Sequence, residues 1–188
     1  MSQVKGIGME EENRRHKEKM KKIKAKKQKI LAAKKEEKGL LIVHTGAGKG
    51  KSSSGFGMIL RCIAHEIPCA VVQFIKGTWL TGERKLLTEK FQNECSFIVS
   101  GEGFTWDTQD RERDIAAAQA GWEEAKKLIL NEEIKFILLD EINIAIRYKY
   151  LDVKEVSKFL IEEKPNMTHV CLTGRNADPS LVAAADLV

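Results

Sequence analysis

The sequence has few cysteines and no long apolar run, and both shortages narrow the class of protein. Four cysteines occur in 188 residues, and no pair has the Cys-x-x-Cys spacing of a zinc site or a redox centre. Four dispersed thiols fit a reducing compartment. No apolar run approaches the roughly 20 residues that span a bilayer, and the acidic residues 10–12 argue against a transit peptide. We expect a cytoplasmic protein that does not enter a membrane.

Charge is unevenly distributed along the chain. Residues 1–38 carry 14 Lys and Arg against 6 Asp and Glu, whereas residues 39–188 carry 18 against 21. The length fits one domain plus an extension, so we predict a basic N-terminal tail over 1–38 and one folded domain over 39–188. A solvated helix, a disordered tail and a helix that docks on the core or on a second subunit all fit the tail. Nucleic-acid binding is the least favoured option, because the tail has no aromatic residue for base stacking.

Short apolar runs alternate with helical patterns from residue 39 onward. The runs predict strands at 40–43, 69–75, 96–99, 134–139 and 170–172. The helical patterns lie at 52–65, 108–130 and 153–163. Asp107 and Asp152 are the expected N-caps of the last two helices, and Glu155 is spaced for a capping box. This alternation is typical of an α/β fold, a mostly parallel sheet with helices on both faces. One more strand after Val188 would suit the pattern.

A glycine-rich loop is the clearest motif. It reads Gly46-Ala47-Gly48-Lys49-Gly50-Lys51-Ser52 and stands between the first predicted strand and the first predicted helix. Glycines let backbone N–H groups converge on phosphate oxygens, and a helix N-terminus favours an anion. Lys51 supplies positive charge, and the Ser52 hydroxyl is suited to ligate Mg²⁺. The loop departs from the usual G-x-x-x-x-G-K-[ST] pattern, which needs glycine where this chain has Thr45. A glycine-rich turn without a ligand is the alternative.

Two carboxylates, Asp140 and Glu141, follow the fourth predicted strand. A phosphate-binding loop needs an acidic partner for its metal at the end of another buried strand. Successive side chains of an extended segment point in opposite directions. We therefore expect one carboxylate to complete the shell of Mg²⁺ (or Mn²⁺) and the other to support it. The alternative is a surface pair at the start of a helix.

Phe104 and Trp106 lie in a glycine-flanked segment after the third predicted strand, where loops of a parallel sheet form a ligand crevice. The alternative is that both rings belong to the core. Together with other motifs, this segment resembles the CobA-type family of ATP:corrinoid adenosyltransferases over residues 39–188. The motifs that carry the resemblance, in this order, are Gly46–Ser52, Val72–Gly77, Gly82–Arg84, Gly103–Gln109, Leu139–Glu141 and Thr173–Asn176.

The resemblance implies a P-loop, RecA-like fold and a defined reaction. The family transfers the 5′-deoxyadenosyl group of ATP to the Co(I) of a reduced corrinoid, cob(I)alamin or a precursor, and triphosphate leaves. By the same resemblance, Lys51 and Glu141 are catalytic, and Glu141 is the metal partner of Ser52, with Asp140 beside it. ATP would contact the loop Gly46–Ser52 and Arg175. Phe104 and Trp106 would bind the corrinoid and displace its lower axial ligand.

The family also implies partners. They are a second copy of the chain in a homodimer, whose N-terminal helix can cover the active site, and an electron-donating reductase such as a flavodoxin-type protein. Family members continue past the position of Val188 with a strand and a tail, so we expect a shortened form. Two other functions fit the loop alone: a P-loop ATPase or kinase, which would form ADP, and a nucleotide-dependent module that binds nucleic acid through the basic tail.

Substitutions at Phe104 and Trp106 test the corrinoid role. Aromatic rings supply bulk and exclude water but offer cobalt no ligand. Phe104→His should stabilise five-coordinate Co(II), and Trp106→Ala should open a void for the displaced base. Each variant should lose most activity with a weak biological reductant and recover it when cob(I)alamin is supplied already reduced. Equal losses in both assays, with Co(II) spectra like those of the wild type, would make these rings ordinary core.

Overall fold

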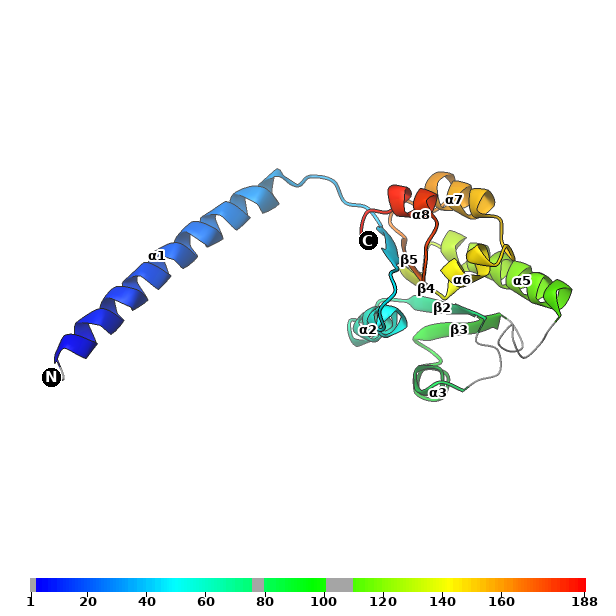
Figure 1. The fold of residues 1–188 in the computed structure, drawn as a ribbon, viewed down its shortest axis with the longest axis horizontal. Helices are drawn as coiled ribbons and strands as arrows, with labels where there is room; N and C mark the ends of the chain where they lie inside the picture. Colours follow the sequence, from blue (N-terminus) through cyan, green and yellow to red (C-terminus); the bar gives the residue numbers. More distant parts are fainter. Residues whose placement is uncertain (1–2, 76–79, 101–109) are drawn as a thin grey trace. The chain divides into compact units, whose positions relative to one another are not determined.

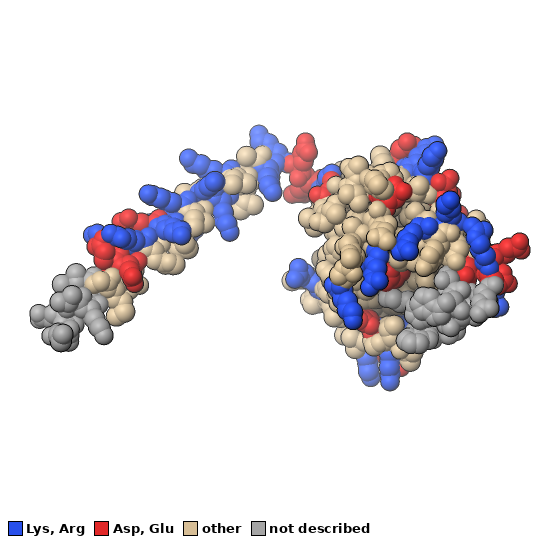
Figure 2. Space-filling view, in the orientation of Figure 1, with Lys and Arg blue, Asp and Glu red and all other residues tan. Residues whose placement is uncertain are grey.

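The computed structural model describes residues 3–75, 80–100 and 110–188, with side chains from residue 8 onward. The chain divides into two compact units, Met1–Glu37 and Lys38–Val188. The first unit contains helix α1 (Gln3–Ala33), whose described side chains are almost all exposed. Lys and Arg follow most of its length (Figure 2). The division into a basic tail and an independently folding domain stays a prediction.

The second unit is built on a parallel sheet (Figure 1). Its described strands are β1 (Leu41–His44), β2 (Cys69–Phe74), β3 (Cys95–Ser100), β4 (Phe136–Asp140) and β5 (His169–Thr173). They lie in the order β1-β5-β4-β2-β3, and all four ladders are parallel. The predicted strands and the α/β fold class are confirmed. The order brings the carboxyl ends of β1, β5, β4 and β2 together at one edge of the sheet.

Helices cover both faces of this sheet (Figure 1). Helices α2 (Lys51–Ala64) and α3 (Gly82–Lys90) lie on one face, and the others are α5 (Arg111–Leu130), α6 (Ile142–Arg147), α7 (Val153–Glu162) and α8 (Pro179–Ala184). On the first face Phe56 packs with Val71. On the second face Val72 packs with Trp122, whose ring meets Phe159 edge-on at 5.4 Å between centroids. Adjacent strand residues thus face different cores, which is the alternation expected of extended backbone.

Three helices, α5, α7 and α8, start after an aspartate that caps them, although not always the one predicted. Asp152 caps α7 as predicted, because its carboxylate accepts from the Lys154 N–H at 2.9 Å. Helix α5 starts later than predicted, with Asp110 as its N-cap; Asp107 lies outside the described residues. Glu155 accepts a hydrogen bond from the indole of Trp122 at 3.0 Å. That carboxylate therefore ties α7 to α5 rather than completing a capping box.

The residues after α8 run beside β1. Leu187 forms a parallel bridge with Ile42, and its carbonyl accepts from the Val43 N–H at 2.9 Å. The Asp186 carboxylate accepts from the Leu41 N–H at 2.9 Å and from the ammonium group of Lys38. Residues 186 and 187 thus extend the sheet beside β1, and a strand after Val188 stays a prediction. None of the described helices has the length and apolar character of a membrane span.

Candidate active site

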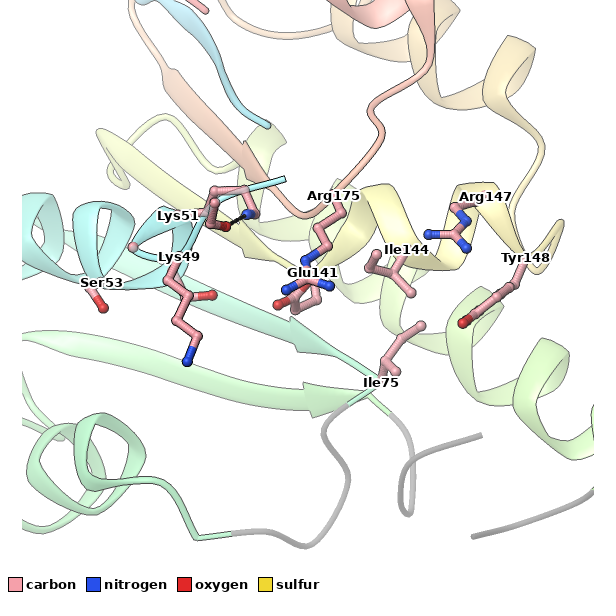
Figure 3. Close-up of a pocket in the computed structure, with 12 residues that line it drawn as sticks. Lys49, Lys51, Ser53, Ile75, Glu141, Ile144, Arg147, Tyr148 and Arg175 are labelled. Atoms are coloured by element: carbon pink, nitrogen blue, oxygen red, sulfur yellow. Dashed lines mark hydrogen bonds between the residues drawn. The ribbon is translucent and has the colours of Figure 1, made fainter. Parts of the chain in front are cut away.

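A cavity of about 570 Å³ opens at the carboxyl edge of the sheet. This volume is within the range of small-molecule binding pockets. Its walls come from the segments that follow four strands, and Figure 3 shows the side chains. The lining residues are Gly48, Lys49, Gly50, Lys51, Ser52, Ser53, Ile75, Glu141, Ile144, Arg147, Tyr148 and Arg175. The cavity therefore joins the glycine-rich loop to the acidic end of β4, as the sequence predicts.

The glycine-rich loop needs glycine at two of its positions. Gly46 and Gly50 have φ values of 102° and 100°, in the region that side chains with a Cβ rarely adopt. Gly50 is also the N-cap of α2, and it leaves the first turn of that helix without a side-chain cap or an acidic residue. The first N–H groups of a helix are suitable donors to an anion. The loop thus directs an uncapped helix N-terminus at the cavity.

Lys51 folds back over the loop (Figure 3). Its ammonium group donates to the carbonyl of Gly46 at 3.0 Å and to the carbonyl of Gly48. Lys49, Arg147 and Arg175 also line the cavity, and Glu141 is the acidic residue among the described lining. This excess of positive charge fits a polyphosphate. An incoming phosphate would replace the loop carbonyls as the partner of the Lys51 ammonium.

Asp140 is fully buried at the end of β4. Its carboxylate accepts from the amide of Gln73 at 2.9 Å and from the hydroxyl of Thr173 at 2.8 Å. The three residues stand at the carboxyl ends of β4, β2 and β5. The amide oxygen of Gln73 is buried without a hydrogen-bond partner in the described part of the chain. Asp140 is thus held in the sheet by two hydrogen bonds, and sequence reasoning did not single out the two residues that form them.

Glu141 points elsewhere. It adopts a left-handed conformation with φ 63°, serves as the N-cap of α6 and lines the cavity. Its N–H donates to the hydroxyl of Thr173 at 2.9 Å. The backbone thus turns sharply between the two carboxylates, so that one is buried and the other reaches the cavity. The pair does stand at a helix start, as the alternative held, but only Glu141 faces the cavity.

Gly174 makes room for this turn. Its φ is 130°, and a Cβ there would lie 2.9 Å from the Cβ of Asn143 and 3.3 Å from Oε2 of Glu141. The first distance is shorter than Cβ atoms ordinarily tolerate, and the second is tight. Glycine is therefore required both by the backbone and by the position of the Glu141 carboxylate.

Comparison with known proteins agrees with this geometry. Residues 37–188 match the sequence model of the family described as ATP:corrinoid adenosyltransferase BtuR/CobO/CobP. The chain belongs to this family. It is 61% identical over 179 residues to a corrinoid adenosyltransferase of Sinorhizobium sp., covering 95% of this chain and 84% of the relative. Corrinoid adenosyltransferases of Pseudomonas aeruginosa and Escherichia coli K12 are 46% and 39% identical, over 95% and 93% of this chain and 87% of each relative.

Family membership makes adenosyl transfer to a corrinoid the activity of this chain, and the ATPase or kinase alternative is not favoured. Of the predicted site residues, Gly48–Ser52, Glu141 and Arg175 line the cavity. Gly46 and Ala47 belong to its loop, and Asp140 is buried and is not part of the lining. Phe104 and Trp106 lie outside the described residues. Sequence reasoning missed Ile75, Ile144, Arg147 and Tyr148, because only the fold brings these segments to one edge.

Two of the cysteines, Cys62 and Cys171, have thiols whose pKa is raised. Burial raises the pKa of the Cys62 thiol to about 11, and burial with the nearby Asp140 carboxylate raises the pKa of Cys171 to about 12. Both thiols are therefore protonated at neutral pH, and a protonated thiol is a poor nucleophile. Among the described residues, no group of three or more His, Cys, Asp or Glu side chains is arranged to hold a metal.

Gly174→Ala tests the turn that separates the two carboxylates. The strained φ and the crowding should lower the free energy of unfolding by about 1–3 kcal/mol and displace the Glu141 carboxylate. Gly57→Ala is the matched control, because its Cβ would meet nothing within 4 Å and a helical Gly→Ala change gains roughly 0.5–1 kcal/mol. Urea unfolding of both variants measures the effect. Equal stabilities would show that the turn tolerates a side chain.

Proposed function

We propose that this chain binds the triphosphate of ATP in the loop Gly46–Ser52 and transfers the 5′-deoxyadenosyl group to the Co(I) of a corrinoid. The observation that carries the proposal is the cavity, in which an uncapped helix N-terminus meets Lys49, Lys51 and Arg175. These groups suit a polyphosphate. The family and its curated relatives support the corrinoid as the second substrate.

The reaction is a displacement at the ribose C5′. The electron pair of Co(I) forms the Co–C bond, the C5′–O bond breaks, and its electron pair leaves with the triphosphate. The protein therefore needs no nucleophile of its own, which agrees with its protonated thiols. Its contribution is to hold the leaving group. Lys49, Lys51 and Arg175 stabilise the negative charge that develops on the triphosphate, and fixed charges in a cavity do so without reorganisation.

The residues at the cavity fit Mg²⁺ or Mn²⁺. Ser52 and Glu141 both line it, and a hydroxyl and a carboxylate are oxygen donors of the kind that Mg²⁺ prefers. The metal would supply charge neutralisation on the triphosphate. Asp140, held by Gln73 and Thr173, would support these ligands by fixing the end of β4 from which Glu141 follows.

The corrinoid side of the reaction depends on residues and partners that the resemblance suggests. Phe104 and Trp106 exclude water and the lower axial ligand from cobalt, which favours the four-coordinate state. The Co(I) state requires an electron donor, for which a flavodoxin-type reductase is suited. By the same resemblance, we propose that the chain acts as a homodimer.

The products of the reaction test this function. The protein is incubated anaerobically with ATP, Mg²⁺ and chemically reduced cob(I)alamin. We expect light-sensitive adenosylcobalamin and inorganic triphosphate in equal amounts. Lys51→Ala should strongly reduce both at limiting ATP, by weakening ATP binding by about 1.5–3 kcal/mol. Formation of ADP and phosphate without adenosylcobalamin would contradict the proposal and indicate a P-loop hydrolase.

Glu141→Gln and Asp140→Asn separate metal binding from support. Glu141→Gln should reduce the Mg²⁺ affinity of the ATP complex and leave stability unchanged, because the side chain lines the cavity. Asp140→Asn should lower the free energy of unfolding by about 1–3 kcal/mol, since a buried amide presents a donor where a carboxylate accepted. Metal titration and urea unfolding of both variants measure the two effects. If Asp140→Asn alone lost the response to Mg²⁺, the two roles would be reversed.

A further inference from the structure

The segment between β5 and α8, residues 174–178, brings Arg175 to the cavity. Arg175 is one of the lining residues, and its side chain extends from this segment into the cavity (Figure 3). The residue is exposed, so packing around the side chain does not fix its position. An arginine that is free to rotate loses side-chain entropy when it binds an anion. The position of its guanidinium therefore depends on the backbone that carries it.

The backbone on both sides of Arg175 is in an unusual conformation. Gly174 has a φ of 130°, and Asn176 has a φ of 54°. Asparagine tolerates the left-handed region better than most residues, but the conformation still costs energy. Strained backbone of this kind persists only where neighbouring elements hold it, and it is found most often at functional sites. The contacts of this segment with its neighbours are therefore part of how Arg175 is placed.

Three hydrogen bonds connect the segment to β1, α6 and the glycine-rich loop. The N–H of Gly174 donates to the carbonyl of His44 at 3.2 Å. The carbonyl of Gly174 accepts from the amide of Asn143 at 3.3 Å. The N–H of Ala177 donates to the hydroxyl of Thr45 at 2.9 Å. The first two bonds hold the start of the segment, and the third holds the backbone on the other side of Arg175.

Thr45 is placed to connect the arginine with the phosphate-binding loop. It is half-buried, it follows the last residue of β1, and it immediately precedes Gly46. The usual G-x-x-x-x-G-K-[ST] pattern has glycine at this position and therefore no hydroxyl. The hydroxyl of Thr45 thus joins the start of the loop that contains Lys51 to the segment that contains Arg175. Two cations that face one cavity are held in register by a single side chain.

We propose that Thr45 is a positioning residue, which holds Arg175 against the triphosphate of ATP through its hydrogen bond with the N–H of Ala177. The role rests on the proposed function, in which Arg175 contacts ATP. Thr45 is not part of the cavity lining among the described residues. Its effect on phosphate affinity is therefore exerted through the arginine and not by contact with the nucleotide.

Substitution of Thr45 tests this role, with ATP and inorganic triphosphate as the two probes. Thr45→Val keeps the branched shape and removes the acceptor, whereas Thr45→Ser keeps the hydroxyl. Calorimetric titration of the full chain in the presence of Mg²⁺ measures both affinities. Thr45→Val should weaken both about three- to tenfold, as expected for one lost hydrogen bond, and Thr45→Ser should stay close to the wild type. Equal affinities of the valine and serine variants would overturn the role.

Thr88→Val is the matched control. The Thr88 hydroxyl is exposed on α3, where it donates to the carbonyl of Arg84 in its own helix. Its removal takes one threonine hydroxyl from the chain without touching the cavity lining. Both ATP and triphosphate should bind this variant with wild-type affinity. A loss equal to that of Thr45→Val would show that the effect is not specific to the Thr45 bond.

A double-mutant cycle with Arg175 separates positioning from a general effect on structure. Arg175→Ala should weaken triphosphate binding about ten- to hundredfold, as expected for a charged hydrogen-bonding partner. In the Arg175→Ala background, Thr45→Val should then change the affinity by less than about twofold, because residues that act through one another are not additive. The same factor in both backgrounds would show that Thr45 acts on the loop itself and would overturn the role.

The remaining outcomes distinguish this role from the proposed function. Thr45→Gly gives the loop its usual glycine and should also weaken ATP binding, because it lacks the hydroxyl. Wild-type ATP affinity in both the valine and glycine variants, with native urea unfolding curves, would overturn the role of Thr45 and leave adenosyl transfer standing. Failure of the wild-type chain to bind ATP or triphosphate would overturn the proposed function together with this role.

Discussion

The buried carboxylate of Asp140 is the constraint on which the geometry of the site depends. It lies at the end of the central strand β4 and accepts hydrogen bonds from Gln73 of β2 and Thr173 of β5. A buried carboxylate is costly unless hydrogen bonds satisfy it, so these partners hold three strand ends in one register. The same Thr173 hydroxyl accepts from the N–H of Glu141. One network therefore fixes both the sheet edge and the backbone turn that sends Glu141 into the cavity.

Much of the second unit follows from local sequence. The buried strands are short apolar runs, and the phosphate loop is recognisable because Gly46 and Gly50 adopt conformations that suit glycine. Helix α3 escaped prediction because it buries only Leu87 among its described residues, too little to create an apolar stripe. The other features of the site depend on tertiary structure. The left-handed turn at Glu141 and the support from Gln73 require three strands to meet, which no single segment encodes.

Thr45 explains why the loop departs from the usual pattern. A glycine there would add freedom to the backbone, but it would remove the hydroxyl that accepts from the Ala177 N–H. The shorter loop instead begins from a residue anchored to the segment that follows β5. Arg175, which lines the cavity at the glycine-rich loop, stands in that segment. If a bound nucleotide displaced the loop, the segment that carries Arg175 would therefore move with it.

The pairing of residues 186 and 187 with β1 has a consequence for the behaviour of the protein in solution. β1 is the last described strand on its side of the sheet, and an exposed strand edge is a template for pairing with another chain. Here the outward N–H groups of Leu41 and Val43 already donate to the Asp186 carboxylate and the Leu187 carbonyl. Lys38 forms an ion pair with Asp186 at the same edge. Chains that keep residues 186 and 187 beside β1 should resist edge-to-edge aggregation. Displacement of these residues would expose a strand edge that can pair with another chain.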